Sequence, residues 1–434
     1  MLRVIPTIIS ALLLGAHLFR IGDYGLTVTV LAAPFLLLYR RLFILRIVQV
    51  LLIIGAVAWI EITFDFLNIQ KAIGEPYIRL ELILGGVTLF TAISSLLLEN
   101  KKILNRYLDS AGSNLPSTIV FFLTAITLAI VHLKVDLTML MLERFLPGWG
   151  WFEILGISTY AAFITEKMLD PANSTKWRFR IWTVFSIVFF GQLVIGLLGI
   201  EKMLMTGTLH LPVPAMIVAG PLFRGEGFFM PILFLSTIAL IGPAWCSHIC
   251  YIGAWDAALA KRRRTPKKLP WWRKHIRWYI LGGIIAVTII LRAFNVDALI
   301  ATIAGGLFGV IGVIIMVIWS RKSGSMVHCN TYCPIGPLAT LLGRVNPFRI
   351  RITDSCDDCG KCRLRCRFDA LNIEDIEKRK PDPLSCTLCG DCLSSCPHES
   401  LEYRFLGMKP ENARRLFIIL VISIHACTMA LARI

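Results

Sequence analysis

Two cysteine runs of identical spacing carry the most specific chemical signal in this sequence. They read CDDCGKCRLRC, from Cys356 to Cys366, and CTLCGDCLSSC, from Cys386 to Cys396. Both have the form C-x2-C-x2-C-x3-C, in which three closely spaced thiolates can hold three irons of one 4Fe-4S cubane. Zinc sites more often pair two C-x2-C halves across a longer spacer, and a disulfide framework does not suit a reducing cytosol. The runs therefore predict iron-sulfur clusters.

The fourth cysteine of each run is expected to reach across to the other cluster. One expected ligand set is Cys356, Cys359, Cys362 and Cys396; the other is Cys366, Cys386, Cys389 and Cys392. Gly360 and Gly390 stand where a tight turn favours glycine. Pro397 follows Cys396, as the motif prefers, whereas Arg367 follows Cys366. Because every thiolate is used for iron, the two cubanes predict an electron path with no open catalytic position.

A second cysteine pattern, C-x3-C-x-Ile-Gly, occurs twice at the ends of apolar segments. It reads CSHICYIG over residues 246–253 and CNTYCPIG over residues 329–336. If each C-x3-C is helical, its sulfurs share one face at i and i+4, and two such faces would supply four ligands. Four thiolates suit Cu(I), Zn or another iron-sulfur cluster, whereas the alternatives are redox-active thiols and buried cysteines that only pack. The repeat favours a metal or third redox site formed by Cys246, Cys250, Cys329 and Cys333.

Composition indicates which elements must position these cysteines. The chain has 434 residues, of which 56% are hydrophobic, and a mean hydropathy of +0.70, which is typical of an integral membrane protein. A spanning helix needs roughly 20 mostly apolar residues. Eleven spans are expected, near residues 4–20, 26–39, 42–64, 78–98, 116–134, 150–166, 181–200, 227–245, 278–294, 300–320 and 414–433. No cleavable signal peptide is expected, because the first 20 residues lack a charged leader and a cleavage site.

The basic residues predict the orientation of the chain, whose formal net charge is +17. They gather on alternate connections: Arg40 and Arg41; Lys101, Lys102 and Arg106; Lys176, Arg178 and Arg180; KRRRTPKK from Lys261; and Arg321 onward. By the positive-inside rule, the amino terminus and both C-x3-C segments face the cytoplasm, while Ile434 lies outside. The basic run from Lys261 to Arg277 is interpreted as an orientation signal that also attracts anionic lipid. Nucleic acid is not an expected partner, because topology accounts for the charge.

The expected fold is a polytopic α-helical membrane protein of about eleven spans with a small cytoplasmic α+β ferredoxin domain of the bacterial 2×4Fe-4S type. The expected domains are an N-terminal bundle of about six spans over residues 1–170 and a membrane module with both C-x3-C segments over 171–345. The ferredoxin domain follows over 346–410, and a C-terminal transmembrane helix over 411–434.

Several histidines and one proline-broken stretch are weaker candidates. His17, His132 and His425 lie in or at the ends of spans, but no two share a span at helical spacing, so haem is disfavoured. His248 and His328 accompany the C-x3-C segments as extra ligands or proton carriers.

The stretch HLPVPAMIVAGPLFRGEGF, residues 210–228, is apolar yet broken by three prolines. Broken backbone at membrane depth is tolerated inside protein or beside a cavity. The stretch is a candidate quinone pocket, with His210, Arg224 and Glu226 as proton-handling groups; a re-entrant structural loop is the alternative.

Spans that end in C-x3-C segments and precede a double-cubane insert resemble the membrane-bound polyferredoxins related to NapH and NosR, and the CcoG copper-reducing assembly factors. The resemblance covers roughly residues 180–410; the first 170 residues have no counterpart. In that family both membrane pairs read C-x3-C-P, whereas here Cys250 is followed by Tyr251. The resemblance implies a quinol dehydrogenase or oxidoreductase subunit of the respiratory chain, or a protein that reduces a metal ion.

The favoured hypothesis is a cytoplasmic (inner) membrane protein that passes electrons between the quinone pool and a redox partner protein or membrane complex. The alternative is a copper reductase or assembly factor that uses the four C-x3-C thiols. Transport by the first six spans is disfavoured, because they contain few mid-span charges.

Overall fold

The computed structural model describes residues 4–107, 115–204 and 211–431 of the chain. The chain divides into two compact units, residues 1–166 and 167–434, and this division falls close to the end of the expected N-terminal bundle. Each unit is described by itself. Both are mainly helical, and the second also contains the short two-stranded sheet.

The first unit is an all-helical bundle in the part of it that the structure describes. Its helices are α1 (Ile5–Arg20), α2 (Tyr24–Ala32), η2 (Ala33–Leu38), α3 (Leu42–Ile73), α4 (Ile78–Leu97), α5 (Lys101–Tyr107), α6 (Leu115–Lys134), α7 (Met141–Phe145) and α8 (Gly150–Leu169). Phe43, Leu45 and Ile47 are fully buried on the central α3. Ser95 of α4 donates a hydrogen bond to the Gln49 carbonyl oxygen of α3 at 3.1 Å, so polar groups also tie these two apolar helices together.

Outside the cysteine insert, the second unit also consists of helices. They are α9 (Pro171–Leu197), η3 (Glu201–Met203), α10 (Met216–Arg224), α11 (Phe229–Ile241), η4 (Gly242–Ala244), α12 (Trp245–His248), α13 (Tyr251–Ala260), α14 (Arg273–Ala293), α15 (Ala298–Ile315), the π-helix η5 (Met316–Ser320), α16 (Arg321–Ser323), the π-helix η6 (His328–Tyr332), α17 (Ile335–Leu342) and α19 (Pro410–Leu431).

Eight helices among the described residues are long and apolar enough to cross a membrane. They are Leu42–Ile73, Ile78–Leu97, Leu115–Lys134, Pro171–Leu197, Phe229–His248, His275–Ala293, Ala298–Ser323 and Pro410–Leu431, and each overlaps an expected span. The other three expected spans are also helical but fall outside this set. Two of them are shorter apolar helices, Ile5–Arg20 and Tyr24–Leu38, and the third, α8, carries Glu153, Glu166 and Lys167. A count of eleven spans stays a prediction.

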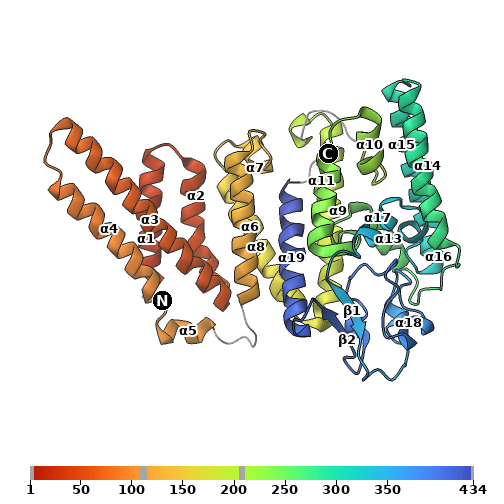
Figure 1. The fold of residues 1–434 in the computed structure, drawn as a ribbon. Helices are drawn as coiled ribbons and strands as arrows, with labels where there is room; N and C mark the ends of the chain where they lie inside the picture. The colour runs from red at the N-terminus through yellow and green to blue at the C-terminus, as the bar shows by residue number, and fades with distance from the viewer. Residues whose placement is uncertain (1–3, 108–114, 205–210, 432–434) are drawn as a thin grey trace. The chain divides into compact units, whose positions relative to one another are not determined.

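The insert between α17 and α19 is closed by two short strands, one on either side of the cysteine runs. β1 (Arg349–Ile352) pairs antiparallel with β2 (Leu401–Arg404), with Arg349 opposite Arg404 and Ile352 opposite Leu401. Between the strands lie η7 (Arg363–Arg365), α18 (Ile373–Glu377) and η8 (Leu393–Ser395). β2 packs on α19, and η8 packs on α9. The insert is therefore held directly against the helices of its own unit (Figure 1).

Candidate metal centres

The two cysteine runs of the insert fold into equivalent loops. Asp358 and Leu388, each before the second cysteine of its run, have φ of 57° and 55°. Gly360 and Gly390, which follow that cysteine, have φ of 69° and 77°. A left-handed glycine after the second cysteine is thus required in both runs, as the sequence predicted.

Each run also directs a backbone N–H at its fourth cysteine. The Ala370 N–H donates to Cys366 Sγ at 3.2 Å, and the Ser400 N–H donates to Cys396 Sγ at 3.3 Å. Such hydrogen bonds favour the thiolate form that iron requires and adjust the potential of a bound cluster.

The thiols of the insert influence one another mainly within two groups, with one link between them, because Cys362 also raises the pKa of Cys392. Burial, followed by Cys389 and Cys386, raises the pKa of the Cys366 thiol. Burial likewise raises the pKa of Cys362 to about 11, with contributions from Cys356 and Cys396. These neighbours fall within the two ligand sets expected from the sequence. Eight thiols in two groups, with repeated turns and N–H donors, fit two 4Fe-4S clusters; ligation itself stays a prediction.

The structure brings the two C-x3-C segments together. Cys246, Cys250, Cys329 and Cys333 line one cavity, and Phe368, Leu384, Ser385 and Thr387 of the insert close the same cavity. Burial, then Asp256 and the other three cysteines, raises the pKa of the Cys329 thiol. Four cysteines distant in sequence thus share one environment beside the insert. Whether they hold a metal or a cluster stays a prediction.

Neither C-x3-C segment is a continuous α-helix, which corrects the i and i+4 geometry assumed from the sequence. Cys246 lies in α12, but Cys250 is extended, with ψ of 113°, and precedes α13. Cys329 lies in the π-helix η6, and Cys333 is extended, with ψ of 121°, before α17. In both segments the second cysteine therefore lies at the start of a new helix, where free N–H groups are available to its sulfur.

The repeated Ile-Gly is explained by this geometry. Burial raises the pKa of the Cys250 thiol to about 12, whereas the Gly253 and Ile252 N–H groups lower it. The same pair of N–H groups, from Gly336 and Ile335, lowers the pKa of Cys333, which burial raises. The helix N-terminus favours a thiolate at both positions.

Each glycine of the repeat also packs against the first cysteine of its own segment. A Cβ on Gly253 would lie 3.0 Å from the Cys246 carbonyl oxygen, and a Cβ on Gly336 would lie 3.0 Å from the Cys329 carbonyl oxygen. The spacing between the first cysteine and the glycine is therefore a packing requirement of this turn.

Tyr251 occupies the place of the proline without altering the exit of the chain. It begins α13, and Pro334 precedes α17 in a helical conformation, with φ of −74° and ψ of −21°. Proline is well suited to the start of a helix but is not required there. The Tyr251 ring stacks on Phe189 at 4.1 Å between centroids, so the tyrosine fixes this turn to α9.

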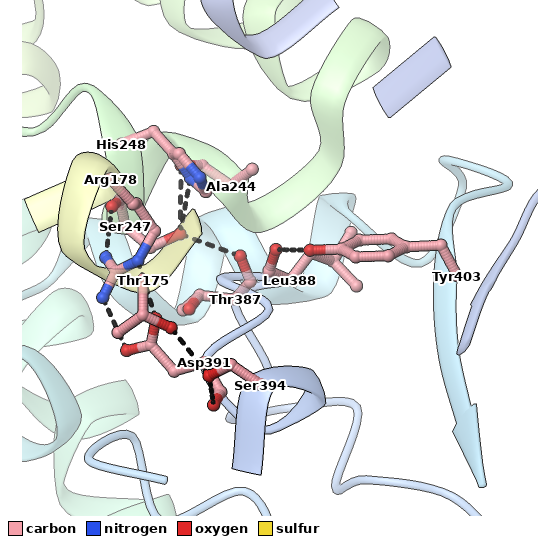
Figure 2. Close-up of polar contacts among 10 residues, drawn as sticks. All are labelled: Thr175, Arg178, Ala244, Ser247, His248, Thr387, Leu388, Asp391, Ser394 and Tyr403. Atoms are coloured by element: carbon pink, nitrogen blue, oxygen red, sulfur yellow. Dashed lines mark hydrogen bonds and ion pairs between the residues drawn. The ribbon is translucent and has the colours of Figure 1, made fainter. Parts of the chain in front are cut away.

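Arg178 of α9 joins the first C-x3-C segment to the second cysteine run (Figure 2). Its Nε and Nη2 donate to the two Asp391 carboxylate oxygens at 3.0 and 2.6 Å, and its Nη1 donates to the Ser247 carbonyl oxygen at 2.8 Å. The Ser247 hydroxyl donates to the Thr387 carbonyl oxygen at 3.0 Å. From the sequence, Arg178 was interpreted as one of the basic loop residues that orient the chain in the membrane. The structure instead shows a buried residue that positions the first C-x3-C segment and the second cysteine run.

Two arginines of the basic run are likewise buried against the insert. Arg273 donates to Ser385 Oγ at 3.1 Å and to the Asp369 carbonyl oxygen at 2.9 Å. Arg277, one helical turn later, donates to the Leu384 carbonyl oxygen at 2.9 Å. The interpretation of this run as an orientation signal that also attracts anionic lipid was therefore incomplete. The available signal was two arginines spaced i and i+4 on the side of the membrane where the polar insert was expected.

Arg367, which departs from the expected proline, also binds the insert to the helices. Its Nη1 donates to the carbonyl oxygens of Ala260 and Gly324 at 2.8 and 2.6 Å. Its own carbonyl oxygen accepts from the Met326 N–H at 2.9 Å. Arginine at this position therefore donates to carbonyl oxygens at the ends of two helices, α13 and α16.

A buried carboxylate lies behind the C-x3-C cavity. Asp256 is fully buried, and its Oδ2 accepts from the Cys329 N–H at 3.0 Å. Burial raises its pKa to about 6. The sequence analysis did not identify Asp256, whose only signal is one acidic residue within the apolar segment YIGAWDAALA.

The candidate histidines are dispersed. His17 packs on Trp59 and His132 on Trp151 in the first unit. His248, His328 and His425 are buried in the second, and the His425 Nδ1 lies 3.3 Å from the His248 carbonyl oxygen. Within the described part of the chain, no three His, Cys, Asp or Glu side chains are grouped so as to hold a metal ion. A role for His248 or His328 as an extra ligand or proton carrier stays a prediction.

The proline-broken stretch is described from residue 211 onward, so His210 lies outside the described residues. Arg224 ends α10, and both it and Glu226 are exposed. Arg292 of α14 donates to the Leu222 carbonyl oxygen at 3.0 Å in an exposed position, so a side chain from another helix satisfies part of this broken backbone. A quinone pocket at this stretch stays a prediction.

In a comparison with known protein families, the matching regions of this chain contain the C-x3-C segments. Residues 223–270 and 305–353 each match the family model of a 4Fe-4S binding domain. Each match contains one C-x3-C motif, and both end before the first cysteine of the insert runs. The match supports 4Fe-4S binding by this chain, and it lies on the segments that the sequence analysis treated as less certain.

Three curated relatives match parts of the chain. "Putative electron transport protein YccM" of Escherichia coli (strain K12) is 22% identical over 250 residues, which cover 52% of this chain and 65% of YccM. The uncharacterized protein MJ0750 of Methanocaldococcus jannaschii is 22% identical over 245 residues, which cover 53% of this chain and 92% of that protein. MJ0749 of the same organism is 27% identical over 79 residues, which cover 18% of this chain and 30% of that protein.

The chain thus spans less than two thirds of YccM. No solved structure matches it at a significant level. The 4Fe-4S match supports iron-sulfur binding by this chain, and YccM is described as a putative electron transport protein.

Proposed function

We propose that this chain is a membrane-bound electron-transfer protein that passes electrons between the quinone pool and a redox partner through three iron-sulfur centres. The first would be held by Cys246, Cys250, Cys329 and Cys333. The second would be held by Cys366, Cys386, Cys389 and Cys392, and the third by Cys356, Cys359, Cys362 and Cys396. When bound, each cluster supplies a site that accepts and releases one electron.

The observation that carries this proposal is the single cavity shared by the four C-x3-C cysteines and the insert. Thr387 and Ser385, which flank Cys386, form part of its wall. Cys329 also packs with Cys366 and Cys389 around Phe368 and Met326. The C-x3-C site and the second cysteine set therefore adjoin one another, which suits transfer between neighbouring centres.

The exposure of the cysteines indicates which of the three proposed centres lies nearest to solvent. Cys392 and Cys362 are buried, whereas Cys359 of the first run is exposed. The Cys359 N–H donates to the Asp357 carboxylate at 3.3 Å. The first-run cluster would thus be the outermost of the three centres and lie nearest to solvent, with the second centre between it and the C-x3-C site.

The charge of Arg178 would influence the electrostatic environment of the second centre. Burial raises the pKa of the Cys389 thiol to about 12, while the Arg178 guanidinium lowers it. The same positive charge would favour the reduced, more negative state of a cluster at this position.

We further propose that the protein lies in the cytoplasmic (inner) membrane, with the insert in the cytoplasm and the C-terminus outside. The alternation of basic connections supports this orientation. Within this role, the similarity to NapH- and NosR-related proteins supports quinol as the electron donor.

A second candidate function is reduction or transfer of a soft metal such as Cu(I) by the C-x3-C thiols, as in CcoG-type factors. Four thiols on one cavity favour it. The family-model match of a 4Fe-4S binding domain, however, covers both C-x3-C segments. This match favours a cluster over a single metal ion at these four thiols.

Anaerobic purification with metal analysis and EPR tests both candidates. Three cubanes predict about twelve irons per chain. About eight irons with one bound copper would instead support the metal-handling function and overturn the third cluster. Iron near zero with stoichiometric zinc would overturn the electron-transfer proposal altogether.

A further inference from the structure

An open groove runs along the surface of the insert at β1. Two adjoining hollows share Arg351 and Lys380 in their walls and so form one continuous groove. One end reaches Arg344, just beyond α17, and the other reaches Lys378 and Arg404. We call this surface the basic groove.

Positive charge dominates the basic groove. Its walls contain seven Arg or Lys residues, namely Arg344, Arg349, Arg351, Lys378, Arg379, Lys380 and Arg404, against Asp354 and Glu402. Arg404 pairs with Glu402 at 2.6 Å, and Arg379 pairs with Asp358 outside the groove, also at 2.6 Å. Most of the remaining cations therefore have no internal counter-charge, and the groove favours an anionic occupant.

Arg344, Arg351, Lys378 and Lys380 are exposed, and none of them forms an ion pair with a described carboxylate. Arg349 is different, because its guanidinium donates to backbone carbonyl oxygens, including that of Phe348 at 2.6 Å. Four free cations on one surface would repel one another in the isolated protein. An acidic partner would remove this repulsion on docking.

The basic groove also reaches a predicted cluster ligand. Cys386 and Leu388 of the second run form part of its wall. A molecule seated in the groove would thus contact the cysteine of the second centre directly.

We propose that the basic groove is the docking site for the acidic face of a small soluble electron-transfer protein, which exchanges electrons with the second centre at Cys386. This inference rests on the proposed function. In each encounter one electron leaves the reduced centre of one protein and reduces the centre of the other, and no bond is made or broken.

An anionic lipid is the other chemistry to consider. It would suit Arg344, because Val345 and Leu341 beside it are exposed apolar residues. It would give no role to Lys378 and Lys380, which follow α18 on the insert, nor to the contact with Cys386. The whole length of the groove is better matched by a soluble acidic protein.

The test uses the full chain, purified anaerobically in detergent, with a reduced acidic bacterial ferredoxin as the probe. Stopped-flow absorbance measures reduction of the clusters, and biolayer interferometry measures binding. Both should weaken as salt rises, because the screening length falls from about 30 Å at 0.01 M to about 3 Å at 1 M. The double variant R351E/K380E should lower the second-order rate on the order of tenfold at low salt.

The matched control is the double variant R264E/K409E, which makes the same charge change at exposed residues outside the groove. It should retain the wild-type rate and binding. Equal loss in both variants, or no binding by the wild-type protein, would overturn the docking site. Loss of binding to phosphatidylglycerol vesicles in R351E/K380E, with ferredoxin binding unchanged, would assign the groove to lipid and also overturn it.

Iron analysis and EPR of each variant separate this inference from the proposed function. Missing clusters in the wild-type protein would refute the proposed function, while ferredoxin binding would still report on the groove. Intact clusters whose rate of reduction is indifferent to R351E/K380E would refute the groove alone.

Discussion

Arg178 and Asp391 form a two-hydrogen-bond ion pair, with Nε to Oδ1 at 3.0 Å and Nη2 to Oδ2 at 2.6 Å. The Arg178 side chain is 4% exposed and the Asp391 side chain 14%. The pair fixes the loop of the second cysteine run to α9. A third hydrogen bond of Arg178 holds the Ser247 carbonyl oxygen of the first C-x3-C segment.

R178Q should loosen the insert and shift the second centre. Removing one partner of a buried pair costs about 3 kcal/mol or more, because the remaining charge is left buried and unpaired. The lost positive charge should also lower the midpoint potential of the second cluster. Limited proteolysis and an EPR-monitored redox titration measure the two effects.

R379Q is the matched control for R178Q. Arg379 pairs with Asp358 beside the first run, but both side chains are substantially exposed, at 32% and 50%. An exposed pair contributes at most about 1 kcal/mol, so stability should change little. If R178Q and R379Q behave alike, Arg178 does not position the second centre.

C250S and C333S should each remove the centre at the C-x3-C cavity. Iron should fall by about four atoms per chain, while the EPR signals of the two insert clusters persist. C427S is the control, because Cys427 lies within α19 and belongs to neither cysteine pattern. Unchanged iron in both variants would show that these thiols only pack.

C359S and C389S should each cost the insert one cluster. The C389S variant should also weaken docking of the insert, because Cys389 packs beside Trp182 and Phe368, whereas Cys359 is exposed. Iron analysis and thermal unfolding distinguish the two variants. Retention of all iron in both would contradict the ligand sets.

G253A tests the packing requirement of the C-x-Ile-Gly repeat. Its Cβ would lie 2.5 Å from the Trp182 ring as well as 3.0 Å from the Cys246 carbonyl oxygen, and such overpacking costs about 1–3 kcal/mol. G336A should cost less, because only the Cys329 carbonyl oxygen lies within reach. G282A is the control, since nothing lies within 4 Å of its Cβ. A thermal shift as large in G282A as in G253A would refute this account.

A reporter inserted near Pro383 should be active in the cytoplasm, and one fused after Ile434 should be active outside. The reason is the alternation of basic connections along the chain. Activity of both reporters on the same side would show that the number of spans between them has been misjudged.

The sequence by itself determined the chemistry that depends on neighbouring residues. The insert cysteines lie within two short runs, so their spacing alone predicts cluster loops. The left-handed turns at Gly360 and Gly390 follow from the same short spacing, because the chain must turn tightly between the cysteines. The apolar stretches likewise predict membrane-length helices, because length and hydropathy are properties of a continuous segment.

Only the tertiary structure decided which distant groups meet. Arg178 and Asp391 are 213 residues apart, and a pattern-based reading assigns Arg178 to a basic loop because nothing near it in sequence reveals a buried carboxylate. The same holds for the four C-x3-C cysteines, whose common cavity depends on how α12, η6 and the insert pack. Local spacing specifies which ligands a segment offers, whereas burial and long-range pairing decide where those ligands converge.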